Sequence, residues 1–162
     1  MVDKKMSYQE LESLKAALEE LERRKEHGGH LEKFFIDEGP FRYENYPKHL
    51  KFFAQGAQHR ERLFMAANRV GKTVCGGYEA ACHLTGLYPA GWEGRRFDGP
   101  TDGWVAGDTG QTTRDIVQDT LLGFPTAPVG TGMIPGDLIT QVRRRAGIAD
   151  AIDTVKVKHV SG

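Results

Sequence analysis

A short apolar run that leads straight into a glycine-containing turn constrains this chain more than any other feature. Residues Leu63 to Ala66 are continuously apolar, which is typical of a strand buried on both faces. The segment Ala66 to Thr73 (AANRVGKT) follows and matches G-x-x-x-x-G-K-[ST], except that alanine holds the first glycine position. A helical pattern begins directly after it. This succession of strand, turn and helix is the context in which the motif, a P-loop, binds nucleotide phosphates.

The residue types of the turn fit phosphate chemistry. Backbone N–H groups of the turn and of the helix starting at Gly71 would point at the phosphates, backed by the positive end of the helix dipole. Lys72 would neutralise β- and γ-phosphate oxygens, the Thr73 hydroxyl would be a ligand of Mg²⁺, and Arg69 would stabilise charge on the γ-phosphate. We therefore predict that ATP and Mg²⁺ bind here, with Arg69 and Lys72 as catalytic side chains and Thr73 as metal ligand. The predicted nucleotide-binding residues of the turn are Ala66, Ala67, Asn68, Arg69, Val70, Gly71, Lys72 and Thr73.

The same pattern also fits an ordinary strand, turn and helix with a surface lysine, and Arg69 fits an exposed arginine on that turn. Hydrolysis further requires a downstream apolar strand that ends in Asp-Glu, to hold Mg²⁺ and to polarise water. No apolar run after the turn ends in this way. The nearest in form, VAGD, ends at Asp108 without an adjacent acid, so we interpret Asp108 as a helix-capping or loop residue rather than a metal ligand. We expect this chain to bind ATP weakly and not to turn it over.

The order of the predicted elements argues for an α/β fold. Alternating helices and strands are typical of a sheet with parallel neighbours, and three strands would form only part of one. The predicted fold is an incomplete P-loop NTPase domain with a partial parallel sheet, truncated before the Asp-Glu strand. The predicted helices run from Pro47 to about Gly56, from Thr73 to about Leu84 and from about Gln111 to Leu122, and the predicted strands are Leu63 to Ala66, Gly103 to Gly107 and Asp153 to Val160.

An amphipathic helix is predicted before this domain. Ser7 and Glu10 form a capping box, and leucines recur at three-four spacing until two glycines end the pattern. The charged face of this helix is typical of a solvated surface, and its apolar stripe also fits partner binding. We divide the chain into an N-terminal helical extension, 1–45, and a partial P-loop ATPase domain, 46–162.

Composition narrows the class of protein. Lys plus Arg and Asp plus Glu both total 22, so no overall basic field favours nucleic acid, and any DNA contact would be local. No apolar leader follows Met1 and no apolar run is long enough to span a bilayer, so we expect an intracellular protein. The two cysteines, Cys75 and Cys82, lie about two helical turns apart, which is too far for a disulfide. They are predicted to be small core thiols.

Three stretches around the turn carry a family resemblance: YPKHLKFFAQGAQHRERLFMAANRVGKT, GGYEAACHLTGLYP and GWVAGDTGQTTRDIVQDTLLG. Together they resemble the large terminase subunits of tailed bacteriophages and their prophage relatives, from about Tyr46 to Leu122 and more faintly to Gly162. The resemblance implies the N-terminal ATPase domain, of the additional-strand type, of a motor that drives DNA into a procapsid. In that family a metal-dependent nuclease domain follows. The implied partners are double-stranded DNA, the portal protein and the small terminase subunit, with a homo-oligomeric ring at full length in the host cytoplasm and no membrane.

The resemblance also implies roles for single residues. A glutamine upstream of the P-loop contacts adenine in this family, and Gln58 stands at the corresponding place, with Gln55 as the weaker candidate. An arginine within the loop is common in the family, which supports the γ-phosphate role of Arg69. Gln58 also fits an exposed glutamine at a helix end. The run Arg143, Arg144 and Arg145 could contact DNA phosphates, but a solvated helix face is the more usual interpretation.

Two alternatives remain at this point. A P-loop kinase or small NTPase would use the same turn for phosphoryl transfer, but its lid and catalytic acids are not recognisable. An inactive prophage remnant would act only through partner binding.

Overall fold

The computed structural model describes residues 12, 15, 30–35, 39–89 and 91–162. The predicted N-terminal amphipathic helix lies outside these ranges except for Glu12 and Lys15, which are exposed. Among the described residues no helix combines the length and the apolar character needed to cross a membrane. The helical elements are η1 (His30–Lys33), η2 (Tyr43–Asn45), α2 (Pro47–Gln55), α3 (Lys72–Thr85), α4 (Gly110–Thr112), η3 (Thr113–Gln118), α5 (Asp119–Leu122) and η4 (Gly136–Leu138).

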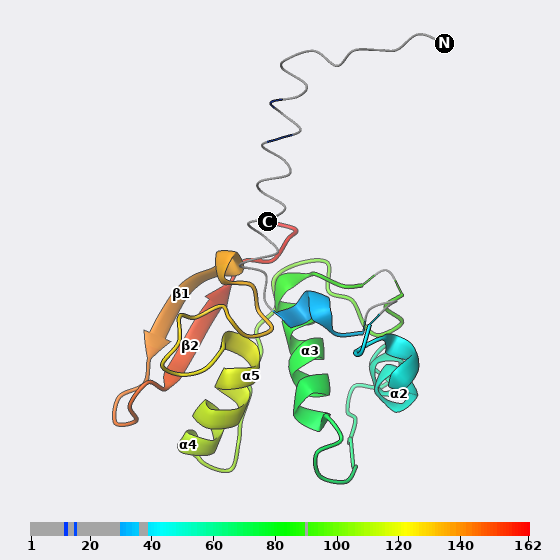
Figure 1. Ribbon diagram of the computed structural model, residues 1–162, viewed down its shortest axis with the longest axis horizontal. Helices are drawn as coiled ribbons and strands as arrows, with labels where there is room; N and C mark the ends of the chain where they lie inside the picture. Colours follow the sequence, from blue (N-terminus) through cyan, green and yellow to red (C-terminus); the bar gives the residue numbers. More distant parts are fainter. Residues whose placement is uncertain (1–11, 13–14, 16–29, 36–38, 90) are drawn as a thin grey trace.

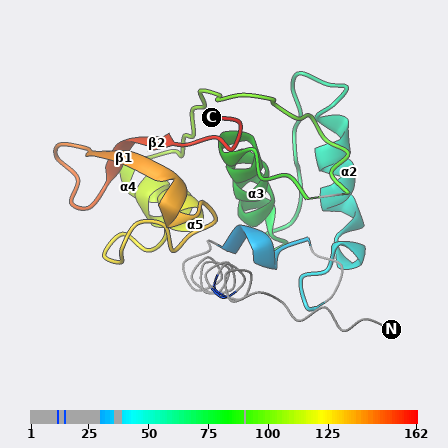
Figure 2. The same ribbon diagram turned by 90° about the horizontal axis from the view of Figure 1, so that it is seen from above.

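Helix α3 lies at the centre of the molecule. Figures 1 and 2 show α2 on one side of it, and α4, α5 and the strands on the other. On the α2 side, Tyr78 packs against Phe53, Trp92 and Phe35, with ring centroids 5.9, 6.3 and 4.7 Å away. The buried residues on the other side include Leu121, Leu122, Met133 and Ile134. The helix predicted after the turn, from Thr73 to about Leu84, is thus confirmed, and it is the core element of the fold.

The helix predicted from about Gln111 to Leu122 is also confirmed, as one continuous helical stretch from Gly110 to Leu122. Thr109 caps it, because its hydroxyl accepts a hydrogen bond from Thr112 N–H at 3.0 Å. The middle of the stretch, η3, is a π-helical segment. Asp108 precedes the cap and accepts a hydrogen bond from Thr109 N–H, which confirms it as a loop residue.

The sheet is antiparallel, so the prediction of a parallel sheet was wrong. Strands β1 (Ile139–Arg144) and β2 (Ile152–Val157) form a two-stranded hairpin in which Val142 faces Val155. A connection of only seven residues joins them, and a connection this short permits only the antiparallel arrangement. The predicted strand at 153–160 corresponds to β2, whereas β1 had not been predicted. Gln118 ties the hairpin to the helical stretch, donating to Asp150 O and accepting from Ile152 N–H.

The arginine run therefore lies on a strand and not on a helix. Arg143 and Arg144 end β1, Arg145 begins the connection, and all three side chains are exposed. Arg144 forms an ion pair with Asp150 at 3.3 Å. The predicted solvent exposure is confirmed and the predicted helix is wrong, because the antiparallel ladder with β2 organises this segment.

Two expected strands belong to no sheet in the described part of the chain. Residues 63–66 and 103–107 have no ladder partner within the described part of the chain. Of these residues only Phe64 is partly buried, whereas Leu63 and Met65 are 80% and 81% exposed and Trp104 is fully exposed. The predicted burial of Leu63 to Ala66 on both faces was therefore wrong, because a strand needs neighbouring strands to bury both of its faces.

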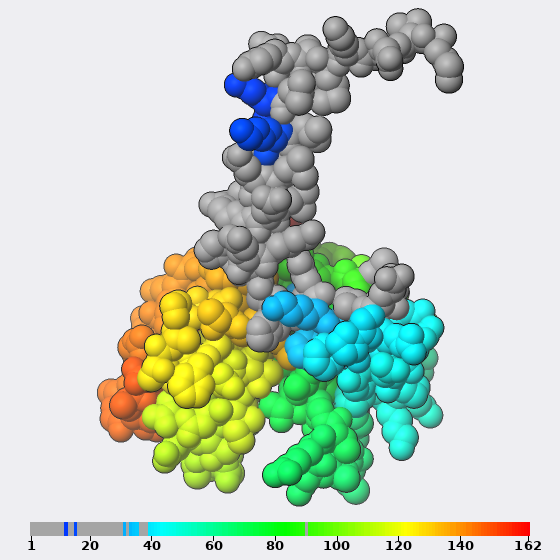
Figure 3. Space-filling view, in the orientation of Figure 1, coloured from blue at the N-terminus to red at the C-terminus, as the bar shows by residue number. Residues whose placement is uncertain are grey.

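Small residues leave a gap beside α3. A cavity of about 180 Å³ lies between α3 and the helical stretch, and Figure 3 shows the two parting at their lower ends. Gly76, Gly77 and Ala80 line it on α3, and Val105 and Val117 face them. The exposed apolar segment 103–107 thus borders an apolar hollow.

Both cysteines are free, buried and part of the core, as predicted. Burial disfavours the thiolate and raises the pKa of Cys75 and of Cys82 to about 12. Both thiols are therefore neutral at pH 8, and the thiolate is the reactive form.

We expect neither cysteine of the native chain to react with iodoacetamide at pH 8, and both to react after unfolding in guanidinium chloride. Mass spectrometry of the alkylated chain measures this. Rapid modification of the native chain at either position would contradict the buried placement of that residue.

Candidate phosphate-binding site

The predicted P-loop, Ala66 to Thr73, is a turn that continues into the first two residues of α3. Residues 68 and 69 form the turn, Arg69 has a φ of 62°, and Gly71 has a φ of 82° and a ψ of 20°. Helix α3 begins at Lys72. Left-handed angles are accessible to glycine without steric cost, whereas at Arg69 they cost about 1–2 kcal/mol. The helix start therefore depends on glycine at position 71.

This backbone makes a concave group of donors. A left-handed residue followed by a right-handed one turns successive N–H groups toward one point, which is an anion-binding arrangement. Gly71 and Lys72 form such a pair. No side chain caps the helix at Gly71, so the first N–H groups of α3 keep their partial positive charge. The amides of Gly71, Lys72 and Thr73 are thus suited to a phosphate group.

Lys72 folds back over the beginning of the turn. Its Nζ donates to Ala66 O at 2.5 Å and to Ala67 O at 3.0 Å. Both partners are neutral carbonyls, and no carboxylate pairs with Lys72 among the described residues. Among the described residues, the ammonium charge within the turn therefore has no neutralising counter-charge.

The other predicted site residues of the turn are exposed. They are Ala66, Ala67, Asn68, Arg69, Val70 and Thr73. Among the described residues, their side chains form no hydrogen bonds. Thr73 is at the second position of α3 and is exposed, and its role as a metal ligand stays a prediction. The described residues contain no cluster of three or more His, Cys, Asp or Glu side chains suited to a metal.

Gln55 and Gln58 lie where α2 ends. Gln55 is the last residue of α2 and Gln58 lies in the exposed turn after it. In the described part of the chain, no side-chain contact brings Gln58 to the loop. The adenine role therefore stays a prediction. A cavity of about 690 Å³ is lined by aromatic residues such as Phe53, Tyr78 and Trp92 and by no residue of the loop. The candidate site is thus an open turn, and of its residues Thr73 also borders the smaller cavity beside α3.

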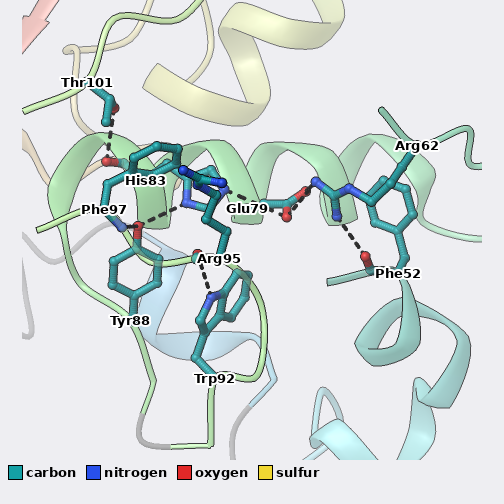
Figure 4. A network of polar contacts seen from close by, with 9 residues as sticks. All are labelled: Phe52, Arg62, Glu79, His83, Tyr88, Trp92, Arg95, Phe97 and Thr101. Atoms are coloured by element: carbon teal, nitrogen blue, oxygen red, sulfur yellow. Dashed lines mark hydrogen bonds and ion pairs between the residues drawn. The ribbon is translucent and has the colours of Figure 1, made fainter. Parts of the chain in front are cut away.

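A buried ion pair holds the segment that enters the turn. Arg62 Nη2 lies 2.9 Å from both carboxylate oxygens of Glu79 on α3, and Nη1 donates to Phe52 O on α2 at 2.7 Å. The guanidinium also covers the Phe52 ring, with 4.4 Å from Cζ to the ring centroid. Figure 4 shows Arg62 between these two partners. Arg62 therefore joins both helices to the segment that leads into the loop.

The same network continues along α3 away from the turn (Figure 4). His83 Nε2 lies 3.7 Å from Glu79 Oε1, and His83 Nδ1 lies 3.0 Å from the Tyr88 hydroxyl. Phe97 N–H donates to that hydroxyl at 3.0 Å. The residues after α3 are thus connected to the same carboxylate as Arg62.

Sequence reasoning did not identify Arg62 or Glu79, and it did not identify His49, whose Nε2 lies 3.1 Å from Val70 O. Each of these contacts joins residues 10 to 21 positions apart. No local spacing rule pairs residues so far apart in sequence. One signal in the sequence could have identified Glu79. It falls on the same helical face as the predicted core residues Cys75 and Cys82, and a charged residue on a core-facing position needs a partner.

Comparisons with known proteins find similarity that includes this part of the chain. The family model described as "Terminase large subunit, T4likevirus-type, N-terminal" matches residues 63–159, which is more than half of the chain. The chain is 32% identical over 133 residues to the "Terminase, large subunit" of Salmonella phage P22, covering 74% of this chain. It spans 27% of the length of that relative. No solved structure matches significantly.

The turn and α3, where the donors converge, both lie inside the matched range. Backbone amides and a lysine at the start of a helix are typical of a site that binds an anion. The chain belongs to the terminase large subunit family, T4-like virus type, of which it matches the N-terminal part. The predicted resemblance is confirmed at this level.

Replacing Glu79 by Gln should lower the free energy of unfolding by about 3 kcal/mol, because Arg62 would be left as an unpaired charge in a site where its side chain is 19% exposed. Urea unfolding followed by circular dichroism measures this. Glu44→Gln is the matched control, since Glu44 pairs with Arg42 at 3.7 Å on the surface, and should change stability by less than about 0.5 kcal/mol. Equal effects of the two substitutions would contradict a buried Arg62–Glu79 pair.

Proposed function

We propose that this chain is the ATP-binding N-terminal part of a phage DNA-packaging motor. The observation that carries the proposal is the start of α3, where left-handed Gly71 precedes Lys72 and the first amides of the helix have no side-chain cap. Family membership favours the motor over a kinase or another small NTPase. The packaging role, the DNA and procapsid partners and the ring of subunits follow from the terminase family.

In this proposal the residues of the turn have different roles in binding the nucleotide. The amides of Gly71, Lys72 and Thr73 bind phosphate oxygens, and the Lys72 ammonium moves from the carbonyls of Ala66 and Ala67 to the β- and γ-phosphates. That movement exchanges two neutral acceptors for anionic ones, which form stronger hydrogen bonds.

The remaining roles concern the metal, the transition state and the base. Thr73 supplies a hydroxyl ligand to Mg²⁺, which neutralises the phosphates when it is bound, and the phosphates supply further oxygen ligands. Arg69, exposed at the tip of the turn, stabilises charge on the γ-phosphate. Gln58 contacts adenine. Because no apolar run after the turn ends in Asp-Glu, this chain binds ATP without turning it over.

Lys72→Ala should weaken Mg-ATP binding about 10- to 100-fold, since a hydrogen bond to a charged group contributes about 1.5–3 kcal/mol and 1.4 kcal/mol is tenfold in affinity. Isothermal titration calorimetry of the parent chain and the variant measures this. Lys51→Ala, on the exposed face of α2, is the matched control and should bind as the parent does.

No heat from the parent chain, or equal affinity of the Lys72→Ala variant and the parent, would refute the proposal. Phosphate release above background from the parent chain would refute only the expected lack of turnover.

A further inference from the structure

One contact to the backbone of the candidate loop comes from a side chain far away in the sequence. His49 Nε2 lies 3.1 Å from the carbonyl oxygen of Val70, which is 21 residues later. His49 belongs to α2 and is 9% exposed, so the imidazole is largely removed from solvent and its contact with Val70 is partly buried. Because a carbonyl oxygen can only accept, Nε2 must carry the proton and donate it. The imidazole is thus a fixed donor to the loop.

Aromatic packing sets the direction of this donor. Three rings surround the imidazole, those of Tyr46, Phe64 and Phe35, with centroids 5.4, 5.3 and 6.1 Å away. Phe64 lies on the segment that enters the loop and stacks on Phe52 of α2 at 4.8 Å. The ring therefore cannot turn away from Val70 without disturbing the packing between α2 and the entering segment.

The hydrogen bond to Val70 also orients a donor of the loop. The peptide between Val70 and Gly71 is planar and trans, so its carbonyl and its N–H point in opposite directions. With the carbonyl held toward α2, the N–H of Gly71 points away from α2. Within the described ranges no acceptor for this N–H is found. A flip of the same peptide would exchange the donor for a carbonyl oxygen, which repels phosphate.

His49 also closes one side of the turn. A Cβ atom placed on Gly71 would lie 3.4 Å from His49 Nε2, so the imidazole is in contact with the loop at the left-handed residue itself. The open side of Gly71 is consequently the side opposite α2.

We propose that His49 is a positioning residue of the candidate phosphate-binding loop: it fixes the Val70–Gly71 peptide so that Gly71 N–H faces the phosphate. This rests on the proposed function, because it concerns how the same loop binds nucleotide. His49 itself does not touch the ligand. It acts through the peptide that it holds.

Two amide substitutions of equal chemistry and different reach test the proposal. Gln places its Nε2 about where the imidazole Nε2 lies, whereas the amide of Asn ends about one bond short. His49→Gln should keep the affinity for Mg-ATP within about twofold of the parent. His49→Asn should weaken it about three- to tenfold, the equivalent of one neutral hydrogen bond. His59→Asn, at an exposed position after α2, is the control and should bind as the parent does.

Calorimetric titration with Mg-ATP gives the affinities, and thermal melts identify a temperature at which all variants are folded. A purely structural His49 would lower the melting temperature of both variants and leave their affinities alike. Equal affinities of the Gln and Asn variants, with Lys72→Ala still weakening binding, would overturn the role of His49 and leave the proposed function intact. No heat from the parent chain would overturn both. If His49→Asn does not fold, loss of affinity in a folded His49→Gln variant would equally overturn the proposal.

Discussion

The burial of one face of α3 is the interaction on which the rest of the structure depends. Tyr78 and Cys82 of this helix lie in the core between the aromatic cluster of α2 and the apolar residues that follow α5. The helix can start where it does only because Gly71 takes left-handed angles immediately before it. Core packing thus fixes in space the helix end at which the amides converge. The same packing explains why the candidate site is an open turn backed by a rigid element.

The helices could be predicted from sequence because their apolar spacing is local. Pro47, Gly86 and Thr109 are start and stop signals that act within a few residues, and each helix ends close to its expected boundary. The sheet could not be predicted in the same way. Whether Leu63 or Trp104 lies in a strand depends on neighbouring strands, and the described chain supplies none beside them. Strand β1 escaped prediction because its inward residues, Ile139 and Val142, are three positions apart and follow no strict alternation.

The candidate site, too, could be predicted from the sequence only in part. The positions of Gly71 and Lys72 at a helix start were predictable, because the turn motif carries its own backbone requirements. The supports of the turn were not, since His49 and Arg62 reach it through contacts between segments separated in sequence. Arg62 holds the segment that enters the loop and His49 holds the peptide before the helix. Two side chains that no motif contains therefore set the geometry on which the motif depends.

The central claim is that the start of α3 receives phosphate. Backbone amide chemical shifts of the ¹⁵N-labelled chain, followed during a titration with Mg-ATP, test it most directly. The account predicts that the amides of Gly71, Lys72 and Thr73 show the largest changes. Unchanged shifts at these three residues, with the largest changes instead at Tyr88 and Trp92 beside the aromatic cavity, would contradict it.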